Sequence, residues 1–180
     1  MNILISILLI VVIIIVFALF LALVVGKNYF IQRDIIIDKP VEDVFEFIKH
    51  IRNQEKYSKW VMKDPHVNLS YSGTDGTEGF VSAWEGNKQA GKGEQEIKTI
   101  EADQFVLVEI RFEKPFKNVA QTYMYTTAVG VGQTKLKWTM EGRNSYPMNL
   151  FNLVIDNLLG KDLSESLVNI KRILERSVPE

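Results

Sequence analysis

Few side chains in this sequence could carry acid–base, nucleophilic or metal chemistry. The chain has no cysteine, which excludes thiolate nucleophiles, disulfides and Cys-ligated metals. Its two histidines, His50 and His66, leave little material for a histidine-based metal site. His50 follows a predicted helix, where a cation interacts favourably with the helix dipole, and His66 falls in a predicted loop. We expect no catalytic residue, no cofactor and no metal site.

Among the carboxylates, Glu85 is the one whose surroundings could suit acid–base catalysis. It adjoins Trp84, and burial beside that ring would raise the pKa of the glutamate. The alternative is a solvated glutamate at the end of a strand, which the following Gly86-Asn87 favours. Asp156 and Asp162 lie six residues apart and do not share a helix face, so they are not a catalytic pair.

Large apolar and aromatic side chains are the more promising functional candidates, because they could form the wall of an apolar pocket. The predicted ligand-binding residues are Trp60, Trp84, Tyr123, Trp138, Met140, Phe151 and Ile155. The alternative is that these residues are ordinary core, since large aromatics dominate cores as well. At Tyr123 the strand phase is ambiguous, because Thr122 and Met124 could equally point inward.

The longest element that could position these residues is a predicted helix over residues 146–176. Its apolar side chains are spaced by three and four positions, so one face of the helix is apolar. Pro147 suits the first helical position, with Ser145 or Asn144 as the cap. Such a helix is about 43 Å long, and its apolar stripe needs a sheet to lie on.

Gly160 interrupts this helix between two well-patterned halves. A glycine inside a helix costs about 1 kcal/mol relative to alanine unless something requires it. We therefore expect a bend or a close backbone contact at Gly160. Asp162 and Glu165 have the spacing of a capping box that restarts the helix after it.

The middle of the chain alternates between apolar and polar residues, as half-buried strands do. Strands are predicted at residues 29–37, 67–71, 80–85, 92–100, 105–112, 119–129 and 134–141, with one helix starting at Pro40 and another at 53–60. Six strands follow one another without a helix between them, so the sheet should be antiparallel and built from hairpins. The glycine-rich stretch 86–93 is a hairpin turn rather than a phosphate site, because no helix follows it.

The first 26 residues contain no charged side chain, and residues 3–25 are apolar except for Ser6. A helix of this length reaches about 34 Å, enough to cross the hydrocarbon core of a bilayer. A cleaved signal peptide is the alternative, but the chain lacks a basic start, the apolar run is long for one, and Val24-Val25-Gly26 is a poor cleavage site. We predict a membrane anchor over residues 1–26 and a domain over 27–180.

Charge gives further information about partners and orientation. With 21 basic and 22 acidic residues the net charge is −1, which argues against nucleic-acid binding. Lys27, Arg33 and Lys39 follow the apolar run, whereas only the terminal amine precedes it. The positive-inside bias therefore predicts a single-pass protein of the cell membrane whose domain faces the cytoplasm.

The element order β-α-α-β-β-β-β-β-β-α predicts an α+β fold in which a seven-stranded curved antiparallel sheet surrounds the long C-terminal helix. This order resembles the helix-grip fold of START domains and the birch-pollen-allergen superfamily. Five segments are similar to bacterial polyketide cyclase/dehydrase-like proteins of the SRPBCC family: 37–45 (IDKPVEDVF), 84–87 (WEGN), 91–93 (GKG), 134–138 (TKLKW) and 160–163 (GKDL). The resemblance spans about residues 30 to 176.

The resemblance implies a cavity between sheet and helix that holds a hydrophobic molecule, a lipid or a steroid-like compound. It implies no shared catalytic motif, and a fold does not fix a function. The main hypothesis is membrane-anchored binding of a hydrophobic small molecule or lipid-like ligand. One alternative is a cyclase/dehydrase-type enzyme that acts on a hydrophobic substrate in the same cavity. Another is an accessory or scaffold domain whose cavity is filled by its own side chains.

Overall fold

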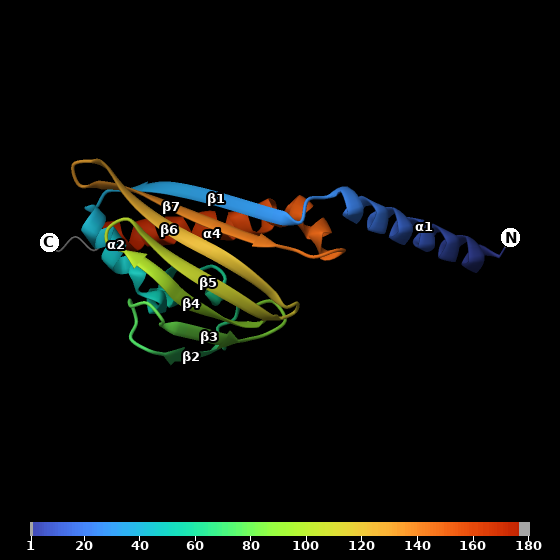
Figure 1. The fold of residues 1–180 in the computed structure, drawn as a ribbon, viewed down its shortest axis with the longest axis horizontal. Helices are drawn as coiled ribbons and strands as arrows, with labels where there is room; N and C mark the ends of the chain where they lie inside the picture. Colours follow the sequence, from blue (N-terminus) through green and yellow to red (C-terminus); the bar gives the residue numbers. More distant parts are fainter. Residues whose placement is uncertain (1, 177–180) are drawn as a thin grey trace.

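One antiparallel sheet lies against a long C-terminal helix, and a separate apolar helix extends from one end of the domain (Figure 1). The computed structural model describes residues 2–176; the outermost ends of the predicted anchor (residue 1) and domain (residues 177–180) lie outside this range. The elements are α1 (Ile3–Val24), β1 (Asn28–Ile37), α2 (Val41–Lys49), η1 (Ile51–Asn53), α3 (Gln54–Tyr57), η2 (Val61–Lys63), β2 (Asn68–Ser72), β3 (Val81–Glu85), β4 (Lys92–Glu101), β5 (Phe105–Lys114), β6 (Asn118–Gly130), β7 (Gln133–Arg143), η3 (Met148–Phe151) and α4 (Asn152–Arg176).

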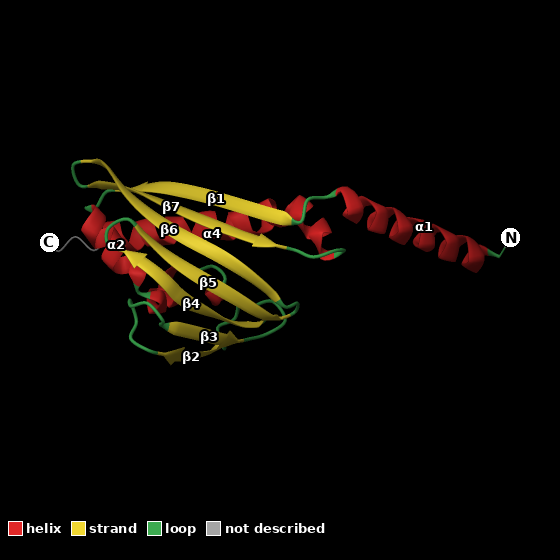
Figure 2. Cartoon of the chain, in the orientation of Figure 1, coloured by secondary structure: helices red, strands yellow, loops and turns green. Residues whose placement is uncertain are grey.

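The seven strands form a single sheet in the order β1-β7-β6-β5-β4-β3-β2. Every neighbouring pair is antiparallel, and β2 to β7 are joined by successive hairpins. The first strand pairs with the last, from Asn28 opposite Arg143 to Ile37 opposite Thr134. Figure 2 shows the sheet with the helices of the domain packed on it. The helix-grip fold expected from the sequence is confirmed.

Alternation along the strands decides which side chains reach the core. Leu136, Trp138 and Met140 of β7 are buried, as are Val106 and Val108 of β5. They pack with the apolar faces of α2 and of the C-terminal half of α4 in two adjoining clusters. The core is therefore deepest where α2 and α4 lie over the sheet.

The long helix differs from its prediction in two places. Its first turn, η3, is a 3-10 helix preceded by Pro147, and α4 proper starts at Asn152. The helix then runs through Gly160 without a restart, so the predicted capping box is wrong. Asp162 instead forms an ion pair with Lys63, in which Nζ lies 2.6 Å from Oδ2.

The close contact expected at Gly160 exists, but its partner is a side chain. A Cβ at this position would lie 2.1 Å from Nη2 of Arg33, on β1. The guanidinium crosses the bare backbone of Gly160 and binds both carboxylate oxygens of Asp156, each at 3.0 Å. Gly160 thus lets β1 and α4 approach each other.

The second predicted helical segment is more broken than expected. Instead of one helix over residues 53–60, the chain forms η1, the single turn α3 and then η2 after Trp60. Hydrogen bonds tie this segment to α4: the Lys59 N–H donates to Ser166 Oγ at 3.0 Å, and Asn169 Nδ2 donates to the Tyr57 carbonyl at 3.1 Å. The segment forms one edge of the space beneath α4.

The apolar N-terminal segment is a helix, α1, of 22 residues. By length and composition it is able to cross a membrane, a test that a signal sequence also passes. Nearly all of its side chains are exposed; Ala22, in its last turn, is the buried one. Figure 1 shows α1 extending away from the sheet, at the end of the domain that carries η3.

Candidate ligand-binding pocket

A cavity of about 980 Å³ opens between the sheet and the N-terminal half of α4. This volume lies at the upper end of the range of small-molecule sites. All seven strands of the sheet contribute side chains, and the other wall consists of the α3–η2 segment, η3 and α4. Most of the wall surface is apolar, although nearly half of the lining residues are polar or charged.

Trp84 forms the side of the pocket next to β3 and β4. It stands opposite Gly93 in the register, and a Cβ on Gly93 would lie 2.7 Å from the indole ring. The missing side chain therefore lets the indole lie flat across β4. Its Nε1 donates to the Ala90 carbonyl at 3.0 Å, and Phe112 packs edge-on against the ring with centroids 5.9 Å apart.

Trp60 closes the same side from the loop before η2. Its ring meets Phe112 edge-on at 6.4 Å, and Lys63 Nζ lies 4.6 Å from the ring centroid. The indole N–H is buried and has no acceptor within residues 2–176. Leaving such a donor unpaired costs about 1–3 kcal/mol.

Trp138 and Met140 approach the pocket from β7, and both are almost fully buried. Trp138 Nε1 donates to Thr122 Oγ1 at 2.6 Å, and its ring packs edge-on against Tyr57 at 6.1 Å. These contacts make Trp138 part of the core and of the pocket wall at once.

From the helix side, Phe151 and Ile155 line the pocket one turn apart. Ile155 packs against the core cluster, whereas Phe151 is 51% exposed and stands at the mouth. Six of the seven predicted residues therefore surround one space; whether they bind a ligand is taken up below.

Tyr123 is the exception, and its assignment to the pocket is wrong. On β6 the inward positions are Thr122 and Met124, both buried, so Tyr123 points to the outer face. There it stacks on Tyr125 with centroids 5.5 Å apart and an interplanar angle of 8°. Thr122 has the inward position because its hydroxyl accepts from Trp138 and donates to the Thr139 carbonyl at 2.7 Å.

Several polar residues of the pocket were missed from the sequence. The amides of Gln54 and Gln95 bind each other reciprocally, at 2.8 and 3.1 Å, and both line the cavity. Gln95 shares its strand face with buried Ile97, so alternation could have placed it inward. Tyr71 donates its hydroxyl proton to Glu55 at the edge of the pocket. Burial, and then the hydrogen bond to Glu55, raise the pKa of Tyr71 well above its usual value.

The candidate acid–base residue Glu85 lies outside this space. It ends β3 in solvent, where Lys92 at 3.3 Å, together with Lys114, holds the pKa of the carboxyl below its usual value. The Glu85 carboxyl therefore lacks the raised pKa that a general acid would need. Within residues 2–176 no group of three His, Asp or Glu side chains is placed to hold a metal ion.

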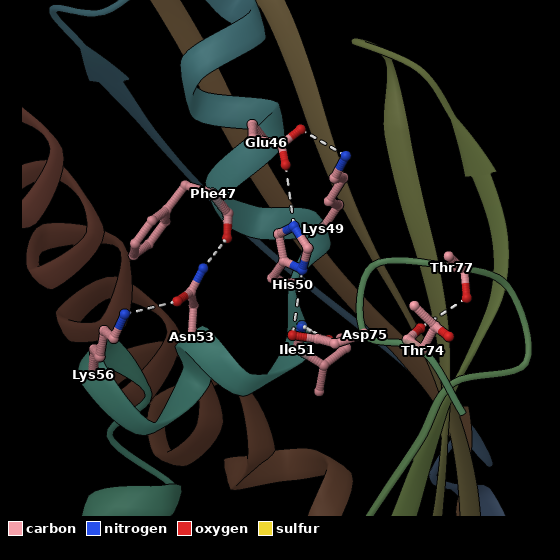
Figure 3. Close-up of polar contacts among 10 residues, drawn as sticks. All are labelled: Glu46, Phe47, Lys49, His50, Ile51, Asn53, Lys56, Thr74, Asp75 and Thr77. Carbon is pink, nitrogen blue, oxygen red and sulfur yellow. Dashed lines mark hydrogen bonds and ion pairs between the residues drawn. The ribbon is translucent and has the colours of Figure 1, made fainter. Parts of the chain in front are cut away.

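His50 has a structural position at the end of α2 (Figure 3). Its ring contacts Glu46 at 3.1 Å and Asp75 at 3.3 Å. Asp75 also accepts from the Ile51 N–H at 2.8 Å, so the pair joins α2 to the turn between β2 and β3. His66 lies in the loop before β2, as expected.

Comparison with known proteins agrees with this architecture. The model of the family described as "Polyketide cyclase / dehydrase and lipid transport" matches residues 31–175. The chain belongs to this family. The matched region includes the motifs at 37–45 and 134–138 from which the resemblance was inferred. No curated protein matches the sequence significantly.

Solved structures show the same fold at low sequence identity. Norcoclaurine synthase from Thalictrum flavum, in complex with dopamine and hydroxybenzaldehyde, is 9% identical with a TM-score of 0.64, over 88% of this chain and 92% of that one. Ara h 8.0201 is 13% identical with a TM-score of 0.60, and the match covers 83% of this chain and 99% of that one. A protein from Chromobacterium violaceum is 12% identical with a TM-score of 0.60, and the match covers 84% of this chain and 98% of that one. At these identities the likeness concerns the fold alone.

Proposed function

We propose that this protein is a membrane-anchored binder of a hydrophobic small molecule or lipid-like ligand. The observation that carries the proposal is the cavity of about 980 Å³ with predominantly apolar walls. A domain filled by its own side chains, the scaffold alternative, would not leave such a space. The family description, which includes lipid transport, supports the same direction.

The pocket has the composition that an elongated, mostly apolar molecule with one polar group needs. Trp84, Phe112 and Ile155 offer apolar contact area, which contributes roughly 25 cal/mol per Å² buried. The Gln54–Gln95 pair and the buried Ser82 offer donors and acceptors for one polar end. Trp60, Trp138, Met140 and Phe151 complete the proposed contact set.

The membrane part of the proposal rests on α1. Its 22 residues reach about 33 Å, enough for the hydrocarbon core. A retained anchor is favoured over a cleaved signal because the end of α1 is hydrogen-bonded to the domain: Ala22, in the last turn, and Val25, the C-cap, accept from Asn149. With Lys27 and Arg33 directly after it, we place the domain on the cytoplasmic side.

A pair of tryptophan substitutions on β5 tests the binding function. Ile110 lines the pocket, so Ile110→Trp should fill part of it, whereas Leu107 lies on the outer face of the same strand. Titration of the full-length protein in mild detergent with an environment-sensitive hydrophobic dye measures the affinity. We expect Ile110→Trp to weaken dye binding at least tenfold and Leu107→Trp to leave it unchanged. Equal affinities for both variants would contradict a ligand site in this cavity.

The second candidate function is a cyclase/dehydrase-type enzyme, and one observation favours it. Tyr71 and Glu55 form a hydrogen-bonded phenol–carboxylate pair that lines the pocket. Such a pair could transfer a proton to or from a bound substrate. Tyr71→Phe removes the acidic proton but keeps the ring. If a ligand identified by co-purification is converted by the wild type and only bound by Tyr71→Phe, the enzyme is favoured; if neither converts it, the protein is a binder.

A further inference from the structure

The end of α1 is fixed to the domain by asparagine side chains. Asn149 Nδ2 donates to the carbonyls of Ala22 at 2.7 Å and Val25 at 2.8 Å, and Asn152 Nδ2 donates to the Gly26 carbonyl at 2.8 Å. Asn149 is fully buried, and so is Ala22 beneath it. The last carbonyls of a helix lack intrahelical partners, and these amides supply them. The hydrogen bonds leave no free linker between anchor and domain.

The mouth of the pocket lies at this same end. Phe116, from the turn between β5 and β6, and Phe151 and Leu158, from η3 and α4, all line the cavity. They are nevertheless 56%, 51% and 61% exposed. Figure 1 shows η3 and the β5–β6 turn at the end of the domain that carries α1, and the β6–β7 turn at the opposite end. A clustered apolar rim of this kind marks a contact surface.

Positive charge surrounds the apolar rim. Lys117, Arg143 and Lys161 line the mouth, and within residues 2–176 none of them makes an ion pair. Of the two acidic residues in the lining, Asp162 is already bound by Lys63 at 2.6 Å, and Glu55 accepts from the Tyr71 hydroxyl. The rim therefore combines apolar side chains with basic side chains that make no ion pair within residues 2–176. This composition suits a surface of anionic headgroups over an acyl layer.

We propose that the asparagine latch of Asn149 and Asn152 holds the mouth of the pocket against an anionic bilayer surface, from which the pocket takes up its ligand. The inference rests on the proposed anchor. If α1 spans the membrane, its last carbonyls lie at the interface, and hydrogen bonds below 3 Å place η3 at the same level. The ligand then passes from the lipid into the cavity without crossing water.

The absence of native cysteine makes this arrangement directly measurable. Single cysteines at Phe116→Cys and Leu158→Cys report on the rim, and Val131→Cys, on the fully exposed β6–β7 turn, is the matched control. Each full-length variant carries an environment-sensitive fluorophore and is reconstituted into vesicles of phosphatidylcholine and phosphatidylglycerol that contain a nitroxide-labelled lipid. We expect quenching at 116 and 158 to exceed that at 131 several-fold. Equal quenching at all three positions would overturn the proposal.

Two further variants test the latch and the charge. Replacing both asparagines (Asn149→Ala with Asn152→Ala) and adding a flexible Gly-Ser insertion after Gly26 removes the amide donors and frees the linker, and quenching at 116 should fall to the level at 131. Lys117→Glu should lower the fraction of molecules whose pocket mouth contacts the bilayer, measured as quenching at 116. The decrease should be at least about fivefold with phosphatidylglycerol present, and much smaller in phosphatidylcholine alone. Undiminished quenching in this combined variant would mean that the latch does not hold the mouth. Dye binding by the combined variant in detergent is the separate readout of the pocket, because it should persist even when docking is lost.

Discussion

The two halves of α4 carry the same apolar periodicity but have opposite surroundings. In the C-terminal half, Leu163, Leu167 and Ile170 are at most 6% exposed and pack against the sheet and α2. In the N-terminal half, Leu158, together with Phe151 of the adjoining η3, lines an open cavity, and both side chains are more than half exposed. Apolar periodicity therefore predicts that a helix face is covered, but not what covers it. In the C-terminal half the sheet covers the apolar face. In the N-terminal half we propose that a ligand and lipid do so.

Different interactions hold the two halves in place. The sealed C-terminal half depends mainly on apolar burial, whereas the open N-terminal half is tied to β1 by the exposed ion pair Arg33–Asp156 at 3.0 Å. Exposed pairs of this kind contribute little individually. The open half should therefore tolerate substitutions that the sealed half does not.

Trp138, where the two halves meet, should give the largest effect. Trp138→Ala removes a buried indole and its contact with Tyr57, so the free energy of unfolding should fall by about 3–5 kcal/mol. The same truncation enlarges the cavity and should change which dyes bind. Chemical denaturation with and without the dye measures both. A loss of this size with unchanged dye binding would show that Trp138 belongs to the core alone.

One substitution made in each half of α4 compares them directly. Leu167→Ala should lower the free energy of unfolding by about 2–5 kcal/mol, because the side chain is 1% exposed. Leu158→Ala should change it by less than about 0.5 kcal/mol but weaken dye binding. Denaturation curves of both variants in the same detergent provide the test. Equal losses of stability would mean that the open half is also core.

Gly160, at the boundary between the halves, should give a smaller effect. Alanine gains about 1 kcal/mol of helix propensity, but its Cβ would displace the Arg33 guanidinium from Asp156. We expect Gly160→Ala to stabilise the domain by clearly less than the propensity difference. In an Arg33→Ala background the full gain should return, since nothing then crosses the glycine. A full gain in the native background would show that the contact with Arg33 has no energetic weight.

Acid should slightly weaken the attachment of the loop before β2 to the β3–β4 turn. The N–H groups of Asn87 at 2.7 Å and His66 at 2.9 Å hold the pKa of Asp64 below its usual value near 4. A lowered folded-state pKa contributes stability above the unfolded pKa, and this contribution is lost as the pH falls through the folded value. Unfolding free energies measured across this acidic range should therefore decline more steeply for the wild type than for Asp64→Asn. Parallel curves for the two proteins would show that Asp64 does not contribute to the pH dependence of stability.

The sequence was sufficient to predict the sheet, because alternation and turn residues are local signals. It was sufficient for the inward face of β7, where Trp138 and Met140 alternate with polar residues. It failed at Tyr123, because both faces of β6 contain residues that could be buried. It could not find the Arg33–Asp156 pair or the reciprocal Gln54–Gln95 bond, whose partners are 123 and 41 residues apart. Such contacts depend on the packing of the whole domain.

Native mass spectrometry of the full-length protein, extracted in mild detergent, tests the central claim most directly. We predict a discrete hydrophobic adduct on the wild type and on Leu107→Trp, which alters only the outer face of β5, and its loss from Ile110→Trp, which fills the cavity. Adduct-free protein in all three samples, combined with dye affinities that Ile110→Trp does not change, would contradict the account.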